Sequence, residues 1–400
     1  MSELERLEQG LAAGQWVPLS PEADAAPMAQ LPPGPGVLVR SGGSSGGSRC
    51  CAQPSLHLDR SAAATAHWLT GIGVDPASTL LLNPLPLAHV SGLMPWWRSR
   101  CWGAGHQPLA PGLMKTPTEL LAFSQGLPAW GKNPAVLSLV PTQLARLLAH
   151  PDGVAFLQQL QLIWIGGAAL PAPLADQARA LQLPLAPCYG STETAAMVVA
   201  LPPDRFLAGE PGCGDPLVDV ELRLAVDGAL QVRTDRLALG RWSADQPGRA
   251  DRWEPLTDAD GWWRSGDQAA LTPGLQIAGR IDGAIHSGGE TVFPEQLEAR
   301  LMASLQAASL PVNAVLLLGV DDPEWGQRLV ALIRLEEGPV PTDEWSRLEV
   351  RLRAMTASWM PAERPMAWHH CEGLEPTAAG KWQRQRWQNW LQSQDSAEMP

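Results

Sequence analysis

The 400-residue chain has a single tyrosine, Tyr189, and only three lysines, Lys115, Lys132 and Lys381. Arginine therefore supplies nearly all of the positive charge, and tryptophan supplies most of the aromatic bulk. This scarcity makes the positions informative, although a single surviving lysine can also be chance. Tyr189 indicates a need for a flat ring with a polar edge, and Lys381 a need for a compact charge on a flexible stem.

Other absences argue against whole classes of protein. The chain has no run of about 18 uninterrupted apolar residues, so we expect no transmembrane span. The six cysteines have no C-x-x-C spacing, which favours free, buried thiols in a reducing compartment over a zinc site or a disulfide framework. A net charge of −12 argues against a nucleic-acid or anionic-membrane partner. The charged N-terminus predicts no signal peptide, and together these features predict a cytoplasmic protein.

The order of sequence patterns predicts an α/β protein, because apolar strands alternate with helices. Before residue 35 we expect a short helix over 2–15 and a Pro/Ala-rich connector. After it we expect strands at 37–39, 136–140 and 162–165, and helices at 143–148, capped by Thr142, and at about 174–181. Two segments in which apolar and polar residues alternate flank Asp227-Gly228, and they predict a β-hairpin between residues 218 and 234.

A second, smaller unit is expected to start near Gly279. Its patterns predict a helix from 294 to about 305, strands at 312–319 and 328–335, a helix around 343–357 and a C-terminal helix from Lys381. We therefore divide the chain into an N-terminal domain, residues 1–281, and a C-terminal domain, residues 282–400.

The segment Ser41–Arg49 is the clearest local signal for chemistry. Its sequence, Ser-Gly-Gly-Ser-Ser-Gly-Gly-Ser-Arg, directly follows an apolar strand. Glycines let backbone N–H groups turn toward an anion, serine hydroxyls add donors, and Arg49 adds charge, so the segment is typical of a phosphate-binding loop. It is not a Walker A loop, because G-x-x-x-x-G-K-[ST] is absent. A flexible Gly/Ser linker is the alternative.

The run that contains the single tyrosine combines groups that suit a nucleotide. The ring of Tyr189 can stack on a base, the hydroxyls of Ser191 and Thr192 can hold a phosphate, and the Glu193 carboxylate is a hard-oxygen ligand suited to Mg²⁺. Alone, the run could equally be an ordinary strand-to-helix turn.

Three further segments hold candidate residues. His89 lies among apolar residues, where a histidine is more often a hydrogen-bonded core residue than a catalyst. Asp267 follows a glycine turn, and its carboxylate is suited to accepting hydrogen bonds from two vicinal hydroxyls. By itself, however, it is an ordinary turn residue. Residues 279–290 contain small residues at spacings typical of a hinge with a tight turn.

Taken in order, these segments resemble the adenylate-forming superfamily of acyl-CoA synthetases, peptide-synthetase adenylation domains and luciferases. The resemblance runs from Ser41 to Arg384 through seven motifs: 41–49, 86–93, 165–168, 189–194, 265–267, 279–298 and 376–384. It implies a large N-terminal α/β domain of layered sheets and helices and a small mobile α+β C-terminal domain. It also implies a reaction in two steps, in which ATP activates a carboxylate as an acyl-adenylate and a thiol, commonly coenzyme A, then displaces AMP.

The resemblance implies a role for each matching residue. ATP would be bound by Ser41, Ser44, Ser45 and Arg49 at its outer phosphates, Gly167, Ala168, Tyr189 and Gly190 at its base, and Asp267 and Arg280 at its ribose. Thr192 would meet the α-phosphate, Glu193 would hold Mg²⁺, and Lys381 would bridge the α-phosphate and the acyl carboxylate. His89 and Ser91 would lie at the acyl group, Asp282 would be the hinge, and Gly288 and Gly289 would lie on the coenzyme A side.

The chain also departs from the family pattern. Arg49 replaces the usual lysine of the phosphate loop and Ser48 the usual proline, which puts the strength of phosphate binding in doubt. Gly283 replaces a common second acid after the hinge. The segment before the phosphate loop is much shorter than in most of the family, so we expect a reduced first subdomain.

Within the superfamily, the short N-terminus, Val-Pro-Thr-Gln-Leu at 140–144 and the His89–Leu93 motif are similar to o-succinylbenzoate–CoA ligases of menaquinone and phylloquinone synthesis, and the composition is similar to cyanobacterial forms. That substrate has a second carboxylate, for which Arg98 and Arg100 are candidates; both could instead be surface arginines on a helix. The alternatives are another small acyl- or aryl-CoA ligase, or a non-catalytic nucleotide-binding relative, although Glu193 and Lys381 are both present. The sequence predicts no oligomeric state.

Overall fold

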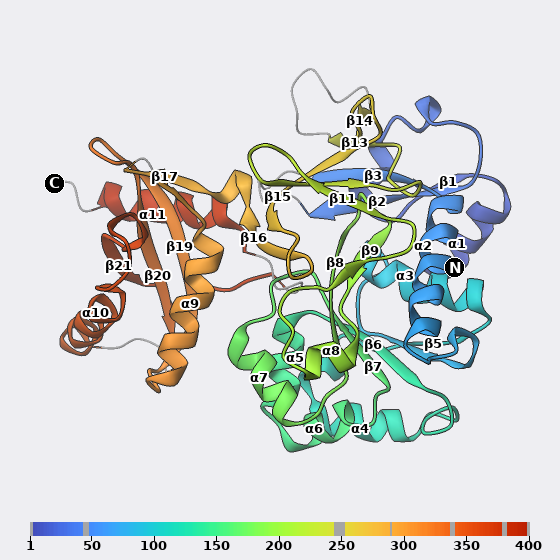
Figure 1. The fold of residues 1–400 in the computed structure, drawn as a ribbon, viewed down its shortest axis with the longest axis horizontal. Helices are drawn as coiled ribbons and strands as arrows, with labels where there is room; N and C mark the ends of the chain where they lie inside the picture. Colours follow the sequence, from blue (N-terminus) through green and yellow to red (C-terminus); the bar gives the residue numbers. More distant parts are fainter. Residues whose placement is uncertain are drawn as a thin grey trace.

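The computed structural model describes residues 3–42, 48–243, 253–288, 290–336, 341–377 and 382–397. A large part lies at the right of Figure 1 and contains the N-terminus, while a smaller part at the left contains the C-terminal elements. Strand β16 (Gln276–Arg280) pairs within the large part and β17 (Ile285–Ser287) within the small part. The chain therefore passes from one part to the other through the short 3-10 helix Ile281–Gly283.

A seven-stranded sheet with the order β10-β9-β8-β7-β6-β4-β5 lies in the large part. Its parallel strands are β4 (Leu80–Asn83), β5 (Gly105–Pro108), β6 (Ala135–Leu139), β7 (Leu162–Ile165) and β8 (Leu185–Ser191), and β9 (Ala196–Ala200) and β10 (Asp215–Pro216) complete it as antiparallel strands. Every residue of β4 and β7 is buried, as expected for parallel strands with helices on both faces. The associated helices are α3 (Val90–Trp102), α4 (Pro117–Gln125), α5 (Pro141–Leu148), α6 (Pro151–Leu157), α7 (Ala172–Ala180) and α8 (Pro203–Leu207).

Two further sheets belong to the large part. One has the order β1-β2-β3-β13-β14, with bounds Trp16–Pro18, Gly36–Gly42, Ser48–Pro54, Gly240–Ser243 and Glu254–Pro255. The other has the order β11-β12-β15-β16, with bounds Glu221–Leu224, Ala229–Arg233, Trp263–Ala270 and Gln276–Arg280. Helix α1 (Glu3–Ala12) precedes the first of these sheets, and α2 (Ser55–Gly71) follows β3.

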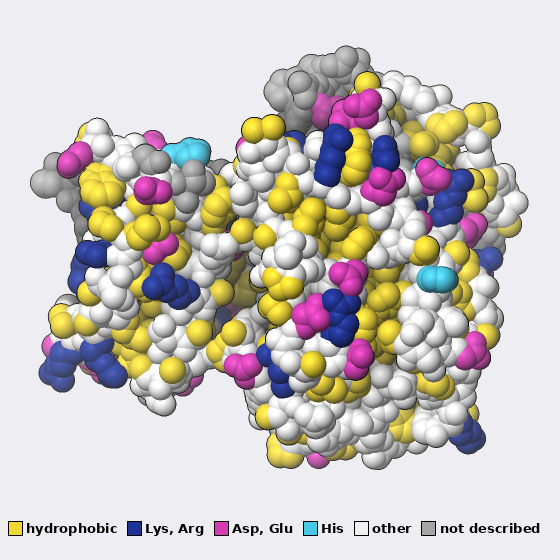
Figure 2. Space-filling view, in the orientation of Figure 1, with side chains coloured by type: hydrophobic (Ala, Val, Ile, Leu, Met, Phe, Trp, Pro, Cys, Tyr) yellow, Lys and Arg dark blue, Asp and Glu magenta, His cyan; other side chains and the backbone are white. Residues whose placement is uncertain are grey.

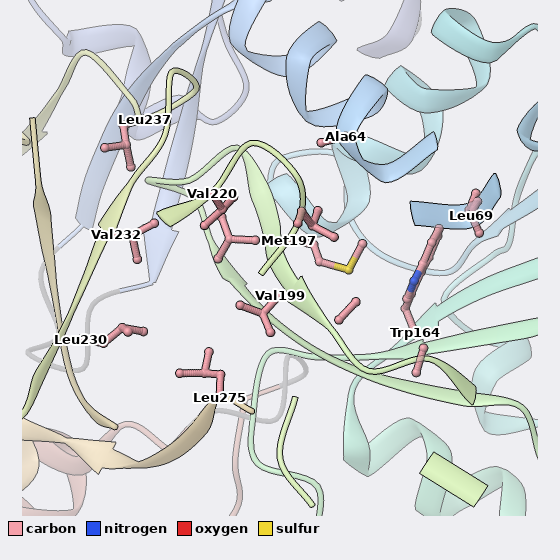
Figure 3. Close-up of a cluster of buried hydrophobic side chains, with 14 of the residues drawn as sticks. Ala64, Leu69, Trp164, Met197, Val199, Val220, Leu230, Val232, Leu237 and Leu275 are labelled. Atoms are coloured by element: carbon pink, nitrogen blue, oxygen red, sulfur yellow. The ribbon is translucent and has the colours of Figure 1, made fainter. Parts of the chain in front are cut away.

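A shared hydrophobic core holds these layers together. It combines side chains from α2, from the central sheet and from the β11–β12 hairpin, as Figure 3 shows for Ala64, Leu69, Trp164, Met197, Val199, Val220, Leu230, Val232, Leu237 and Leu275. Because the interior is close-packed, the sheet edges are held at fixed positions relative to one another. Residues distant in the sequence can therefore form one rigid site.

The small part is an antiparallel sheet with the order β18-β17-β20-β19, to which β21 adds in parallel beside β20. Its strands besides β17 are β18 (Glu290–Val292), β19 (Val312–Asp322), β20 (Gly326–Leu335) and β21 (Ala367–His370). Its helices are α9 (Pro294–Ala307), α10 (Thr342–Thr356) and α11 (Arg384–Ala397). On the face shown in Figure 2, basic and acidic side chains lie beside one another, and a groove separates the two parts.

The structure confirms the predicted α/β class and most predicted elements, including the hairpin at Asp227-Gly228. The capping prediction for Thr142 is wrong: α5 begins at Pro141 with Val140 as its N-cap, since the fixed φ of proline suits the first helical position. Strand β1 lies in the segment that we predicted to be a connector. All six cysteines are free thiols, but the prediction that they are buried is wrong for Cys101, which is exposed, and for the half-buried Cys188 and Cys213. Among the described residues, no helix has both the length and the apolar character needed to cross a bilayer.

Candidate active site

The carboxyl ends of β7 and β8 form one wall of the site. Parallel strands present these ends at one edge of the sheet, where ligands of α/β proteins bind. The exposed Gly167 and Ala168 follow β7, and the half-buried Tyr189 lies near the end of β8. Gly167 has a φ of 82°, which a side chain would strain. The structure thus brings together the residues predicted to lie along a nucleotide base.

Tyr189 is joined to the predicted ribose site. Its hydroxyl donates to Asp267 Oδ2 at 2.5 Å, and Arg280 Nη1 lies 3.4 Å from Asp267 Oδ1. Arg280 also donates to the backbone oxygen of Ser265 at 3.1 Å. A Cβ atom at Gly266 would lie 3.2 Å from Arg280 Nη2, and Gly266 has a φ of 79°, so glycine is needed at this turn.

The protonation states of this group follow from its burial. Burial raises the pKa of the Tyr189 phenol well above its ordinary value, and the Asp267 charge raises it further. Burial also raises the pKa of the Asp267 carboxyl, while the hydrogen bond from Tyr189 and the charge of Arg280 act in the opposite direction. Tyr189 therefore remains a donor at neutral pH, and Asp267 is an acceptor held in place by two partners.

The turn after β8 brings Thr192 and Glu193 beside the start of the predicted phosphate loop. Thr192 Oγ1 donates to the backbone oxygen of Arg40 at 3.3 Å, and Gln53 Nε2 donates to the backbone oxygen of Thr192 at 2.7 Å. Ser41 hydrogen-bonds the Cys51 thiol, whose pKa is raised by burial and then by the charge of Glu193. Ser41, Thr192 and Glu193 are therefore neighbours.

Glu193 fits the expected role of a magnesium ligand. It is 9% exposed, and among the described residues no cation forms an ion pair with its carboxylate. A buried carboxylate is disfavoured unless a cation compensates it. The described residues include no group of three or more His, Cys, Asp or Glu side chains that could hold a metal alone.

Other predicted ATP ligands are only partly covered by the described residues. Ser41 is 6% exposed at the end of β2, and Arg49 lies opposite it in β3. Ser44, Ser45 and the predicted catalytic Lys381 lie outside the described residues, as does Gly289. Gly190 approaches the next strand closely, since a Cβ atom there would lie 2.2 Å from the backbone oxygen of Ala196.

The predicted acyl-side residues lie at the start of α3. His89 is its half-buried N-cap, and Ser91 is exposed in the first turn. Asn83, at the end of β4, orients this segment: its Nδ2 donates to the backbone oxygen of Gly92 at 2.8 Å and lies 3.3 Å from His106 Nε2. Burial lowers the pKa of His106 to about 4, so its ring is neutral and can accept from Asn83.

The two candidate arginines for a second substrate carboxylate have different environments. Arg98 is 4% exposed, with its guanidinium 4.9 Å from the Trp164 ring centroid and 3.2 Å from Thr65 Oγ1. Its Nε has no hydrogen-bond partner, and among the described residues no carboxylate pairs with it. Burial lowers its pKa to about 10, so it is charged at neutral pH.

Arg100 does not fit the same prediction. Its side chain is 53% exposed and forms an ion pair with Glu8 of α1 at 3.4 Å. Its guanidinium also lies over the ring of Trp96. Because these contacts tie Arg100 to the surface near α1, the structure does not bring it to the site with Tyr189, and Arg98 is the better candidate.

The predicted hinge and coenzyme A loop lie where the two parts meet. Asp282 is 48% exposed and accepts both Nε and Nη2 of Arg280 at 2.9 Å, so one arginine bridges the ribose carboxylate and the hinge. Gly288 has a φ of 59°, and its N–H donates to the backbone oxygen of Trp325 at 2.9 Å. A Cβ atom there would lie 2.6 Å from the Trp325 ring.

Comparison with known proteins identifies the family of this chain. The sequence model of the AMP-binding enzyme family matches residues 56–235. A 2-succinylbenzoate–CoA ligase of Salmonella typhimurium is 34% identical over 293 residues, which are 72% of this chain and 57% of that protein. A probable 2-succinylbenzoate–CoA ligase of Mycobacterium tuberculosis is 30% identical over 335 residues, which are 82% of this chain and 78% of that protein. The chain belongs to the AMP-binding enzyme family.

Solved structures agree on the fold of this AMP-binding enzyme. The o-succinylbenzoate CoA synthetase of Bacillus subtilis in complex with its acyl-adenylate intermediate has a TM-score of 0.69 at 22% identity, over 88% of this chain and 68% of that chain. The same enzyme with ATP and magnesium ion has a TM-score of 0.70 at 21% identity, over 96% and 82%. The match to the Salmonella relative spans just 57% of that protein's length.

Two residues of this AMP-binding enzyme's site were not found from the sequence. Gln53 binds the Thr192 backbone, and the fully buried Arg236 binds the backbone of Thr194 at 2.9 Å. Neither lies in a recognisable motif, and their partners are far away in the chain. The predicted resemblance did include Glu298 and Arg384, and the structure joins them: Arg384 donates to both carboxylate oxygens of Glu298 at 2.9 Å.

Proposed function

We propose that this AMP-binding enzyme is an ATP-dependent acid–thiol ligase that activates o-succinylbenzoate as an acyl-adenylate and transfers it to coenzyme A. The observation that carries the nucleotide part is the meeting of Tyr189, Thr192 and Glu193, at the end of β8 and in the turn after it, with Asp267 of β15 and the backbone of Arg40 in β2. The substrate part rests on the relatives, which are named 2-succinylbenzoate–CoA ligases. Such a ligase takes part in menaquinone or phylloquinone synthesis.

The residues of the site divide the work of the first step. The Tyr189 ring stacks on the base, and Asp267 and Arg280 hold the ribose. Thr192 donates to the α-phosphate, which the substrate carboxylate attacks with release of pyrophosphate. Glu193 would hold a magnesium ion, which would neutralise phosphate charge. Lys381 stabilises the charge that develops between acid and phosphate. A preorganised donor of this kind stabilises a transition state by about 3–4 kcal/mol.

The second step needs a different surface of the same site. A thiolate of coenzyme A attacks the acyl carbon and AMP leaves with the electron pair of the broken bond. Gly288 and Gly289 line the coenzyme A side, and rotation at Asp282 brings them in place of Lys381. The mobility of residues 282–400 is part of the proposal, and it is supported by the change of sheet at Ile281–Gly283. A cytoplasmic location remains a prediction from the sequence.

Arg98 is the proposed partner of the second substrate carboxylate. It is a buried cation with an unpartnered Nε, and its electrostatic neighbour Cys188 directly precedes Tyr189. A buried guanidinium gains strongly from a carboxylate. The neighbouring Trp164 ring supports it from one face only.

The decisive experiment measures pyrophosphate release with o-succinylbenzoate and with 4-phenyl-4-oxobutanoate, which lacks only the ring carboxylate. We expect a loss of about 10²–10⁴ in kcat/KM for the second acid, since it leaves a buried cation unpaired. Arg98→Met should abolish this preference, whereas Arg100→Ala, from the same helix, should keep it. Equal kcat/KM values for the two acids in the wild-type enzyme would favour a general aryl- or acyl-CoA ligase.

A further inference from the structure

Arg236 is the largest fully buried side chain of the structure, with 0% exposure, and it lies next to the turn that holds Thr192 and Glu193. Asp219 compensates its charge, with Arg236 Nε at 2.6 Å from Oδ2 and Nη2 at 3.3 Å from Oδ1. Its remaining nitrogen, Nη1, donates to the backbone oxygen of Thr194 at 2.9 Å and lies 3.2 Å from Ser61 Oγ. A fully buried arginine, paired with a partly exposed aspartate, therefore reaches the backbone of the site.

Arg236 is one of several groups that hold successive carbonyls of this turn. Gln53 Nε2 donates to the oxygens of Thr192 and Glu193 at 2.7 and 3.3 Å, and the Ala238 N–H donates to that of Glu193 at 2.8 Å. Ser61 Oγ donates to the oxygen of Ala195 at 2.5 Å. The carbonyls of residues 192–195 are all engaged by protein donors outside the turn, and Arg236 supplies the only charged donor among those described.

The same turn has a strained backbone. Ala195 and Ala196 have φ values of 51° and 79°, in the left-handed region that favours glycine. Two consecutive alanines in this region persist only where the surroundings over-determine the conformation, and such strain is concentrated at functional sites. The hydrogen bonds from Arg236 and Ser61 go to Thr194 and Ala195, at the beginning of this strained pair.

We propose that Arg236, fixed by Asp219, is a positioning residue that holds the turn 192–196 in its strained conformation and thereby aims Thr192 and Glu193 at the phosphates and magnesium of ATP. It touches neither substrate nor metal and acts through the backbone of Thr194. The role in ATP binding rests on the proposed function, but the effect of Arg236 on the turn does not.

The first experiment measures amide hydrogen exchange of the turn without ligands. We expect Arg236→Met to raise exchange in residues 192–196 about tenfold, the effect of losing one charge-assisted hydrogen bond. Arg236→Lys, which keeps the charge but cannot reach all partners, should give a smaller rise and covers the case in which the methionine variant does not fold. Arg233→Met is the matched control, because Arg233 forms an exposed ion pair with Glu221 nearby in the chain. Unchanged exchange of the turn in a folded variant overturns the proposal.

The second experiment follows kinetics and rescue. In the Arg236 variants, the KM for ATP should rise about tenfold, and so should the magnesium concentration that gives half-maximal pyrophosphate release. The KM for the acid should stay constant. Ala195→Gly in the Arg236→Met background should restore part of the order of the turn, because glycine adopts this positive φ without strain, and Ala195→Gly alone should leave exchange nearly unchanged, since Arg236 still binds the Thr194 backbone. If the wild-type enzyme releases no pyrophosphate with any acid, the proposed function fails, and the exchange experiment still decides the role of Arg236. An equal rise in the KM values for ATP and the acid would indicate a general structural role and overturn the proposal.

Discussion

At the scale of single residues, Tyr189 shows why one phenol is retained in a chain rich in tryptophan. Its ring lies at the nucleotide edge of the sheet, while its hydroxyl holds the Asp267 carboxylate at 2.5 Å. Tryptophan offers a ring and an N–H donor but has a different shape, and phenylalanine offers no donor. In the proposed function, Tyr189 therefore connects base binding to ribose binding through a single side chain.

We expect Tyr189→Phe to raise the KM for ATP about tenfold at pH 7, since it removes one hydrogen bond to a charged group but keeps the ring. The tyrosine hydroxyl lowers the pKa of Asp267, which burial raises, so its loss raises that pKa further. Protonated Asp267 cannot accept two ribose hydroxyls. The KM for ATP should therefore rise more steeply in the variant than in the wild type as the pH falls from 7 to 5, and parallel pH profiles would contradict this role.

At the scale of elements, buried polar contacts fix the ends of helices and strands near the site. Arg384, at the start of α11, donates to Glu298 of α9 and to the backbone oxygen of Leu317 in β19 at 2.7 Å. Glu298 in turn accepts from the Leu317 N–H at 2.8 Å. Because Arg384 lies three residues after Lys381 in the sequence, this contact anchors the end of the segment that carries the predicted catalytic lysine.

Glu298→Ala should lower the free energy of unfolding of the C-terminal part by about 3 kcal/mol, because it removes both short hydrogen bonds of the buried Arg384 guanidinium to Glu298 and leaves it with the longer ion pair to Glu295 at 3.8 Å. Asp343→Ala is the control: its ion pair with Arg347 is exposed, and its loss should cost less than about 0.5 kcal/mol. Urea unfolding followed by tryptophan fluorescence measures both. Adenylate formation should also fall more than thiolysis of a supplied acyl-adenylate.

Because of His106 in β5, the stability of the segment that carries His89 should depend on pH. Burial lowers its pKa to about 4 from an ordinary 6.5, so the unfolded chain binds more protons between these values. Stability is complete above the unfolded pKa and is lost as the pH falls from about 6.5 toward 4. The ring is partly exposed, so we expect a loss of about 1–2 kcal/mol. Urea midpoints at pH 7.5 and 5 should differ less in His106→Gln, whereas His67→Gln, at an exposed site, should behave like the wild type.

At the scale of the whole molecule, Arg280 connects the two parts. It contacts Asp267 of the large part and forms a two-pronged ion pair with Asp282 in the segment between the sheets. Rotation of the C-terminal part about Asp282 must change this ion pair. In the proposed function, ribose binding and domain orientation share one guanidinium. The charge of Arg280 is stabilised first by Asp282, which raises its pKa.

Asp282→Pro fixes φ at this position and removes the carboxylate, so we expect it to trap one orientation. Adenylate formation should persist while transfer to coenzyme A drops by more than about tenfold. Asp282→Ala is the matched control, since it removes the same ion pair but leaves the backbone free, and it should retain transfer. Single-turnover measurements separate the steps, and an equal slowing of both steps by proline would show that Asp282 is not the pivot.

The sequence by itself determined the α/β class, the order of the motifs and most residues that we propose to meet ATP. These features depend on local patterns: period and turn chemistry for elements such as β7, and residue types at fixed spacing for Tyr189–Glu193. The sequence could not decide between Arg98 and Arg100, because two arginines in one helix differ only in the residues that pack against them. Packing decided that Arg98 is buried against Trp164 and Arg100 pairs with Glu8.

Only the tertiary structure revealed the support beneath the site. Gln53, Ser61 and Arg236 hold the turn 192–196 from positions far away in the chain, and no local pattern marks them. The left-handed conformation of Ala195 and Ala196 could not be predicted from the sequence either, because such a conformation is expected at glycine and not at alanine. Their conformation depends on contacts that exist only after the sheets and α2 have packed together. The folded structure therefore decides the orientation of Thr192 and Glu193.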